Sequence, residues 1–224
     1  MGIRILIIFG TMCYTIKIDL TREELERKFG AKLTKPEEYK PWSKINAFAL
    51  PALPVICNEN PSEIKLFTWG LIPYWTKDAV KANEIRKKTF NARSESLGEK
   101  ASFRHLIGKK RCLVLVNGFY EWQTMEKSKI PYFIALNNES AFALAGLYDQ
   151  WADPSTGEIL NTFTIITTRA NPMLEIIHNL KKRMPVILSD EAREKWLDIR
   201  NDPTNNGLFE PFPETRMYSE KINI

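Results

Sequence analysis

One residue able to carry chemistry lies in the most apolar and aromatic stretch of this chain. Segment 111–122 reads RCLVLVNGFYEW, and Glu121 stands between Tyr120 and Trp122, just after a continuous apolar run. A carboxyl group that is partly removed from water ionises less easily, so its pKa rises toward the range of a general acid or base. We therefore treat Glu121 as a candidate proton-transfer group. The alternative is an exposed glutamate at the end of a strand, since perturbed acids mark functional sites only statistically.

The composition narrows the class of protein. The 224 residues contain no Gly/Ser-rich or Pro-rich linker, which predicts one domain with one core. Three cysteines (Cys13, Cys57 and Cys112) cannot all pair, and with only two histidines their spacing fits no zinc pattern. We expect no metal and no cofactor. Cys57 and Cys112 lie in apolar runs typical of buried thiols.

Neither a membrane span nor a signal peptide is indicated. No stretch approaches the ~20 apolar residues of a transmembrane helix. The apolar segment 3–9 is short and is not followed by a small-residue cleavage site. We expect a reduced, soluble, monomeric protein of the cytoplasm.

Positive charge is concentrated in one part of the chain. Segment 77–111 contains eleven Lys/Arg against four Asp/Glu, an excess of seven, whereas the whole chain has a net charge of +5. Residues 181–183 (KKR) add a second basic run. Such clusters suit a phosphate backbone, whose contacts provide affinity independent of sequence. A solvated basic face is the alternative.

The pattern of elements predicts an α+β fold. Thr21 and Glu24 form a capping box before a short helix that ends at Gly30, and further helices begin after Asn171 and Ser189. We expect a single domain with a mostly antiparallel, barrel-like or two-sheet β core, because strands outnumber helices and do not alternate with them. The expected strands are 13–18, 64–69, 111–117, 131–136, 142–148, 162–168 and 184–188.

Five segments, in order, resemble a known family. They are Met12-Cys13, the aromatic loop WGLIPYW at 69–75, NARSE at 91–95, GFYEW at 118–122, and His178 followed by RMPV at 183–186. Together they resemble the SRAP family (SOS response-associated peptidase), whose members shield abasic sites in single-stranded DNA. The resemblance extends from Met12 to about Leu188.

The resemblance implies an N-terminal cysteine as nucleophile, which is Cys13 if the chain begins at Met12 and loses it. Asn91 would then hold the α-amine or the sugar oxygens, Glu121 would act as acid or base, and His178 would lie by the sugar and its 3′ phosphate. Without the resemblance, Cys13 would be a buried strand cysteine and His178 a structural residue near a helix end. The residues expected to contact single-stranded DNA are Trp75, Arg93, Arg104, Thr167 and Arg183.

The sequence departs from the family pattern in several places. The family commonly begins Cys-Gly-Arg, but here the segment is Cys13-Tyr14-Thr15, so one basic contact near the nucleophile is lost. The usual Tyr-Asn-x-Ala-Pro segment appears only as NAFALP at 46–51, and four residues instead of one separate His178 from Arg183. Residues 1–11 form a leader before a domain at 12–224, and a retained leader would leave Cys13 without a free amine.

Three functions follow from these residues. The first is an abasic-site sensor that binds single-stranded DNA and forms a thiazolidine crosslink through Cys13. The second is a cysteine-dependent autopeptidase that removes the residues before Cys13. The third is a non-catalytic nucleic-acid-binding module, which would leave Cys13, Asn91, Glu121 and His178 unexplained.

Overall fold

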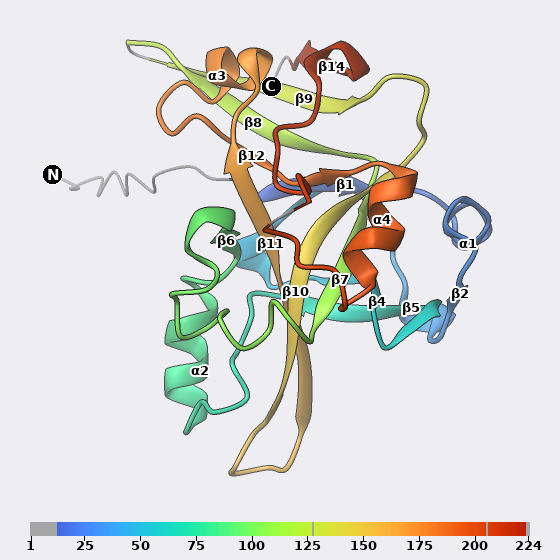
Figure 1. Ribbon diagram of the computed structural model, residues 1–224, viewed down its shortest axis with the longest axis vertical. Helices are drawn as coiled ribbons and strands as arrows, with labels where there is room; N and C mark the ends of the chain where they lie inside the picture. Colours follow the sequence, from blue (N-terminus) through green and yellow to red (C-terminus); the bar gives the residue numbers. More distant parts are fainter. Residues whose placement is uncertain (1–12, 127, 205, 223–224) are drawn as a thin grey trace, which may run out of the picture.

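Two β-sheets form the frame of the protein, and four short α-helices lie around them within the described residues (Figure 1). The computed structural model describes residues 13–126, 128–204 and 206–222. The expected leader 1–11 and Met12 lie outside these residues, so the predicted domain boundary stays a prediction.

One sheet closes into a barrel. Its strands follow the order β11-β10-β7-β4-β5, and β5 pairs in parallel with β11 to complete the ring. The other sheet has the order β14-β9-β8-β1-β3. The strands are β1 Thr15–Ile18, β2 Lys32–Leu33, β3 Trp42–Asn46, β4 Ala52–Cys57, β5 Asn60–Trp69, β6 Asn91–Arg93, β7 Arg111–Val116, β8 Gly118–Thr124, β9 Lys129–Leu136, β10 Phe142–Ala152, β11 Ile159–Arg169, β12 Arg183–Pro185, β13 Ile187–Leu188 and β14 Met217–Lys221. The predicted α+β class with a barrel-like, largely antiparallel core is confirmed.

The three predicted helices are present, and a fourth was not predicted. The helices are α1 Arg22–Phe29, α2 Ala79–Arg86, α3 Pro172–Ile177 and α4 Asp190–Leu197. The capping box of α1 is formed: the Thr21 hydroxyl accepts from the Glu24 amide at 3.3 Å, and the Glu24 carboxylate accepts from the Thr21 amide at 2.8 Å. Helix α2 has no apolar stripe and buries only Ala82, which is why hydrophobic periodicity did not reveal it.

Two of the strands that escaped prediction carry residues that usually interrupt strands. Strand β4 contains Pro54, and proline is uncommon inside a sheet because it cannot donate a ladder hydrogen bond. Strand β8 contains Gly118 and the charged Glu121. The predicted strand 184–188 is instead two short strands, because β12 pairs with β11 whereas β13 pairs with β10.

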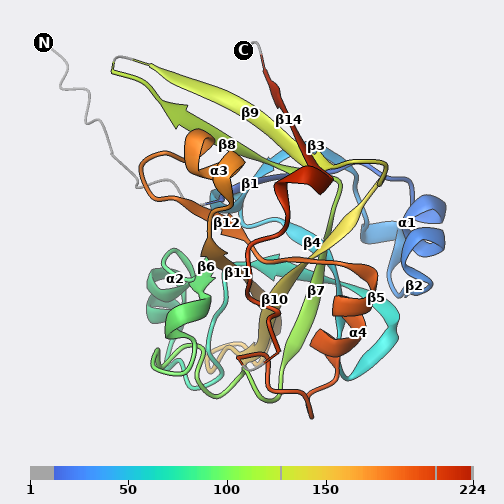
Figure 2. The ribbon, with the colours of Figure 1, turned by 45° about the horizontal axis from the view of Figure 1, so that its top comes forward.

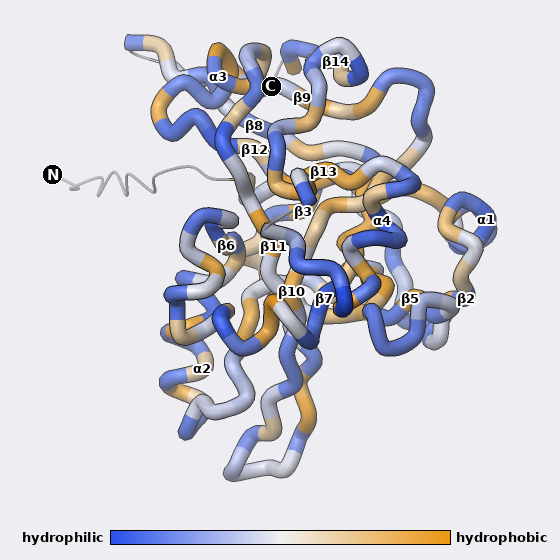
Figure 3. Tube along the Cα trace, viewed as in Figure 1, coloured by the Kyte–Doolittle hydropathy of each residue, from blue (hydrophilic) through white to orange (hydrophobic). Residues whose placement is uncertain are grey.

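The apolar side chains gather in and around the barrel. Figure 3 shows hydrophobic stretches along the central strands and hydrophilic residues at many of the turns. Strand β7 is buried along its whole length, from Arg111 to Val116. Within the described residues, no helix has the length and apolar character needed to cross a membrane.

The chain passes from the barrel to the second sheet at Asn117, between β7 and β8. The Asn117 amide donates to the Lys17 carbonyl at 2.8 Å, and its side-chain oxygen accepts from the Asp19 amide at 2.8 Å. At Gly118, a Cβ would lie 2.5 Å from the Phe133 ring and 2.6 Å from the Ile134 carbonyl oxygen. Glycine is therefore required here by the close approach of β9, and this crossing sets the course of the strand that carries Glu121.

We predict that Gly118→Ala destabilises the fold, since the carbonyl of Ile134 belongs to a paired strand and cannot move away cheaply. The expected loss in free energy of unfolding is about 1–3 kcal/mol, typical of overpacking, and denaturant titration measures it. Gly98→Ala is the matched control, because a Cβ there meets nothing within 4 Å. Equal stabilities for the two variants would contradict the prediction.

Candidate active site

Cys13, Asn91 and Glu121 meet at the start of β1. The Asn91 side-chain amide donates to the Cys13 carbonyl at 2.9 Å. Strand β1 pairs with β8 so that Thr15 faces Tyr120, and continuing this register brings Tyr14 opposite Glu121. Strand β6 delivers Asn91 because it pairs in parallel with β11, with Asn91 opposite Ile165. In Figure 2, β6, β12 and α3 lie beside the start of β1.

The Glu121 carboxyl group is fully buried and has no hydrogen-bond partner among the described residues. Burial raises the pKa of Glu121 well above its usual range. The expected raised-pKa acid is therefore present, although its flanking aromatics are not the cause. Successive side chains of a strand point to opposite faces, so Glu121 shares its face with the buried Phe119 rather than with Tyr120 and Trp122.

The thiol of Cys13 is also enclosed. Its pKa is raised well above the usual range, first by burial and then by the negative charge of nearby Glu121. The thiol is therefore neutral at physiological pH, and Glu121 is close enough to influence its ionisation. The side-chain oxygen of Asn91 is buried with no hydrogen-bond partner among the described residues. The site thus offers an unused acceptor on Asn91 and an unused carboxyl group on Glu121 beside one cysteine.

His178 caps the C-terminal end of α3. The helix is docked on the end of β8, where the Thr124 amide donates to the Asn179 side chain at 3.0 Å and the Asn179 amide group donates back to the Thr124 carbonyl at 2.8 Å. His178 is 1% exposed, and its Nδ1 lies 2.8 Å from the Arg183 carbonyl oxygen but 3.4 Å from the Arg183 amide. These two contacts hold the imidazole against the backbone at the start of β12.

Arg183 and Thr167 are buried, and the Arg183 guanidinium bridges Thr167 and Glu95. The guanidinium of Arg183 donates to both carboxylate oxygens of Glu95 and, at 2.6 Å, to the Thr167 carbonyl. Arg183 is 9% exposed and Thr167 is 1% exposed. A phosphate could contact Arg183 only by displacing Glu95. The structure therefore groups these two predicted DNA contacts inside an ion-pair network, and their role toward DNA stays a prediction.

The other predicted DNA contacts are on the surface. Arg93 is exposed at the end of β6, directly after Asn91 and Ala92, and Trp75 is 44% exposed in the loop after β5. Arg104 is exposed in the turns between β6 and β7. Arg111, counted above in the basic segment, is different: it is 1% exposed, and its guanidinium donates to the carbonyl oxygens of Ile107, Trp196, Asp198 and Asn201.

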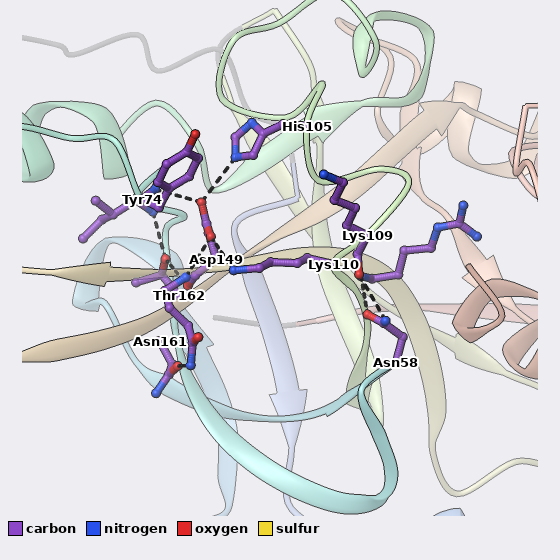
Figure 4. Close-up of polar contacts among 11 residues, drawn as sticks. Asn58, Tyr74, His105, Lys109, Lys110, Asp149, Asn161 and Thr162 are labelled. Atoms are coloured by element: carbon purple, nitrogen blue, oxygen red, sulfur yellow. Dashed lines mark hydrogen bonds and ion pairs between the residues drawn. The ribbon is translucent and has the colours of Figure 1, made fainter. Parts of the chain in front are cut away.

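Asp149 is a buried acid whose importance was not predicted (Figure 4). Its carboxylate accepts from the Tyr74 amide at 2.8 Å and from the Lys110 ammonium at 2.9 Å, and it lies 3.4 Å from Nε2 of His105. It therefore ties the aromatic loop that carries Trp75 to the end of the basic segment. The signal in the sequence was the same as for Glu121, an acid directly after a buried apolar run.

No group of three or more His, Cys, Asp or Glu side chains is placed to hold a metal ion in the part of the chain that the structure describes.

The family model of SOS response associated peptidases (SRAP) matches residues 12–223. The chain belongs to the SRAP family. Two of its relatives are proteins of Bacillus subtilis. Abasic site processing protein YoqW is 37% identical, and the alignment covers 95% of this chain and 92% of YoqW. Abasic site processing protein YobE is 38% identical, and the alignment covers 86% of this chain and 85% of YobE. A crystal structure of a Bacteroides thetaiotaomicron protein superimposes with a TM-score of 0.87 at 37% identity, covering 94% of this chain and 92% of that protein. The predicted SRAP resemblance is confirmed.

We predict that Glu121→Gln stabilises the protein at neutral and alkaline pH. The folded-state pKa of Glu121 lies above the unfolded value of about 4.3, so the folded state holds this proton more tightly. Wild-type stability then falls as pH rises from the unfolded to the folded pKa, whereas the neutral glutamine escapes this loss. The gain in free energy of unfolding is therefore expected to be larger at pH 8 than at pH 4.

Thermal unfolding of both proteins between pH 4 and pH 8 measures this effect. The gain should shrink toward pH 4, where Glu121 is protonated in both states. Glu220→Gln is the control, because Glu220 is exposed on β14. Parallel pH profiles for wild type and Glu121→Gln would show that Glu121 is not buried in the neutral form.

Proposed function

We propose that this SRAP protein processes abasic sites in single-stranded DNA by forming a covalent link through Cys13. The observation that carries the proposal is the buried cluster in which Asn91 binds the Cys13 carbonyl while the unpartnered carboxyl group of Glu121 lies beside the thiol. The names of the Bacillus relatives, abasic site processing proteins, support the same substrate.

The chemistry requires Cys13 to be the first residue. An abasic deoxyribose opens to an aldehyde, and the neutral α-amine adds to its carbon to give a carbinolamine. An α-amine has a pKa near 7.7–8, so roughly a tenth or more is neutral at pH 7. An internal cysteine has an amide nitrogen instead and cannot make this addition. The unused side-chain oxygen of Asn91 is suited to accept a hydrogen bond from the amine and to orient it.

Glu121 then supplies the proton transfers. As a neutral acid it protonates the carbinolamine hydroxyl, and water leaves to give an iminium ion. The Cys13 sulfur adds to the iminium carbon while the thiol proton passes to the Glu121 carboxylate. The product is a thiazolidine ring, one water is released, and Glu121 is protonated again. Because the thiol is neutral until this step, the amine and not the sulfur makes the first attack.

The raised thiol pKa also separates this function from peptidase chemistry. A cysteine peptidase attacks with a thiolate, which requires a lowered thiol pKa, whereas burial and Glu121 raise that of Cys13. Removal of the residues before Cys13 is needed for the crosslink, and we assign no hydrolysis of other substrates to these residues. A purely binding module would leave the buried carboxyl group of Glu121 without a role.

DNA binding is proposed at the surface that surrounds this cluster. Arg93 follows Asn91 by two residues and is exposed, so it is placed to contact a phosphate next to the lesion. Trp75 is exposed and its loop is fixed through Asp149, which suits a ring that stacks on a base. Since the reaction consumes a free thiol and the described cysteines are unpaired, we place the protein, as a monomer, in the reducing cytoplasm.

The first test concerns the covalent link. Protein that begins at Cys13 should form a denaturant-resistant adduct with single-stranded DNA that contains an abasic site, and none with intact DNA, as measured by gel shift and intact mass. Cys13→Ala should abolish the adduct, and retained residues 1–12 should do the same. Cys57→Ala, a buried thiol in β4, is the control that keeps full yield. An undiminished adduct from Cys13→Ala would refute the mechanism.

Glu121→Gln should slow the reaction by about 10²–10⁴-fold with little change in DNA affinity.

A second test concerns the basic surface. Affinity for undamaged single strands should fall with rising salt, with a slope of about −0.7 for each neutralised phosphate. Arg93→Ala should weaken binding by roughly 1.5–3 kcal/mol, the value of a charged hydrogen bond, and should reduce the slope. Arg27→Ala removes an exposed arginine from α1 and should change neither quantity. Identical salt curves for wild type and Arg93→Ala would show that this face is only solvated.

A further inference from the structure

Three aromatic rings pack together at the rim of the candidate active site. The ring centroids of Tyr14 and Phe48 are 5.2 Å apart, those of Phe48 and Phe90 are 5.0 Å apart, and those of Tyr14 and Phe90 are 5.9 Å apart. Tyr14 directly follows Cys13, and Phe90 directly precedes Asn91. The cluster is therefore attached by one peptide bond to each of two residues of the site.

The loop that carries Phe48 is fixed in place by the segment that carries Cys13. The Ala47 amide donates to the Tyr14 carbonyl at 2.8 Å, and the Asn46 side chain donates to the Thr15 hydroxyl at 3.1 Å. The Phe48 amide donates to the Asn46 side-chain oxygen at 2.9 Å. Leu50 ends the turn in the left-handed region, at φ 51. The position of the Phe48 ring is thus set by backbone contacts rather than by chance packing on the surface.

The cluster has a buried side and an exposed side. Phe90 is 1% exposed and supports the other two rings, whereas Phe48 is 44% exposed and Tyr14 is partly buried. An exposed, pre-positioned aromatic ring is suited to stack on a nucleobase, since every base presents a π face. An abasic nucleotide has no base, so the base next to it has lost one stacking partner and has a free face.

No positive charge stands beside these rings at Thr15, the residue after Tyr14. Thr15 is uncharged, 2% exposed and bound to Asn46. The segment after the nucleophile therefore contributes an aromatic ring to the rim and no charge that a phosphate would need.

We propose that Tyr14 and Phe48 form a stacking site for the nucleobase adjacent to the abasic nucleotide. The proposal rests on the proposed function, because the strand has to be held at Cys13 for the neighbouring base to reach these rings. Stacking next to the lesion then adds affinity that does not depend on a phosphate contact. Binding then depends on the base that flanks the lesion, and purines bind better than pyrimidines because their π faces are larger.

The test combines a change in the protein with a change in the DNA. Protein that begins at Cys13 is titrated with two single strands that carry a tetrahydrofuran abasic analogue, which cannot form an adduct. One strand has adenines on both sides of the analogue, and the other has further tetrahydrofuran nucleotides there. Phe48→Ala and Phe48→Leu should lose about 5- to 150-fold in affinity for the first strand, the range measured for base stacking, and stay within about twofold for the second. Phe48→Trp should keep wild-type affinity for both.

The controls separate stacking from stability and from crosslinking. Tyr218→Ala removes an aromatic ring of similar exposure, 43%, from β14 at the edge of the five-stranded sheet. This change should leave both affinities unchanged. Thermal midpoints of all variants show whether a loss of affinity follows a loss of folding. Adduct yield with reactive abasic DNA is measured on the same preparations. If no adduct forms but affinity still depends on the flanking base, the result counts against the chemistry at Cys13 and not against the stacking site. Equal losses on both strands, or no loss for Phe48→Ala, would overturn the stacking site.

Discussion

The parallel pairing of β5 with β11 is the contact on which the site depends. It closes the barrel, and at this seam the Trp69 ring stacks on Phe163 with centroids 6.1 Å apart and planes 12° apart. The indole N–H of Trp69 donates to the Phe90 carbonyl at 2.8 Å, and the Ile165 amide donates to the same oxygen at 3.0 Å. One carbonyl is thus held from two strands, and the next residue is Asn91. The pairing that closes the barrel therefore also places Asn91 beside Cys13.

Asp149 and Glu121 are both buried acids, but their carboxyl groups have different surroundings. Asp149 is 0% exposed and is met by a backbone amide and a lysine ammonium, while a histidine ring lies beside it, so its charge is compensated in place. Hydrogen bonds to charged groups contribute about 1.5–3 kcal/mol each, which is enough to offset much of the desolvation of a carboxylate. Glu121 is equally buried and has no such donors among the described residues. The first arrangement stabilises the structure, whereas the second keeps the carboxyl group protonated to a higher pH at a cost in stability.

The surface around the site combines two kinds of contact. Arg93 is exposed and presents charge, whereas Arg183 is engaged by Glu95 and stabilises the turn that also holds His178. Aromatic rings stand on separate loops, Trp75 after β5 and Phe48 before β4, and each loop is fixed by hydrogen bonds from its backbone to a side chain. In the proposed complex with single-stranded DNA, rings that are already fixed would lose little entropy on binding, and stacking would make the affinity less sensitive to salt than phosphate contacts alone would.

The sequence by itself determined the type of fold, the family and the candidate site residues. Apolar runs and helix caps act over a few neighbouring residues, so the strands β1, β5, β7, β9, β10 and β11 and the helices α1, α3 and α4 were predictable, and five segments in order revealed the family. Only the tertiary structure decided what depends on pairing between distant segments. Whether Glu121 faces the core or solvent follows from the register of β8, since a shift by one residue reverses the face. Local sequence also does not show whether an arginine is exposed or bound to another part of the chain. Arg111 is bound by carbonyl oxygens of a remote segment, and Arg183 is bound by the carboxylate of Glu95.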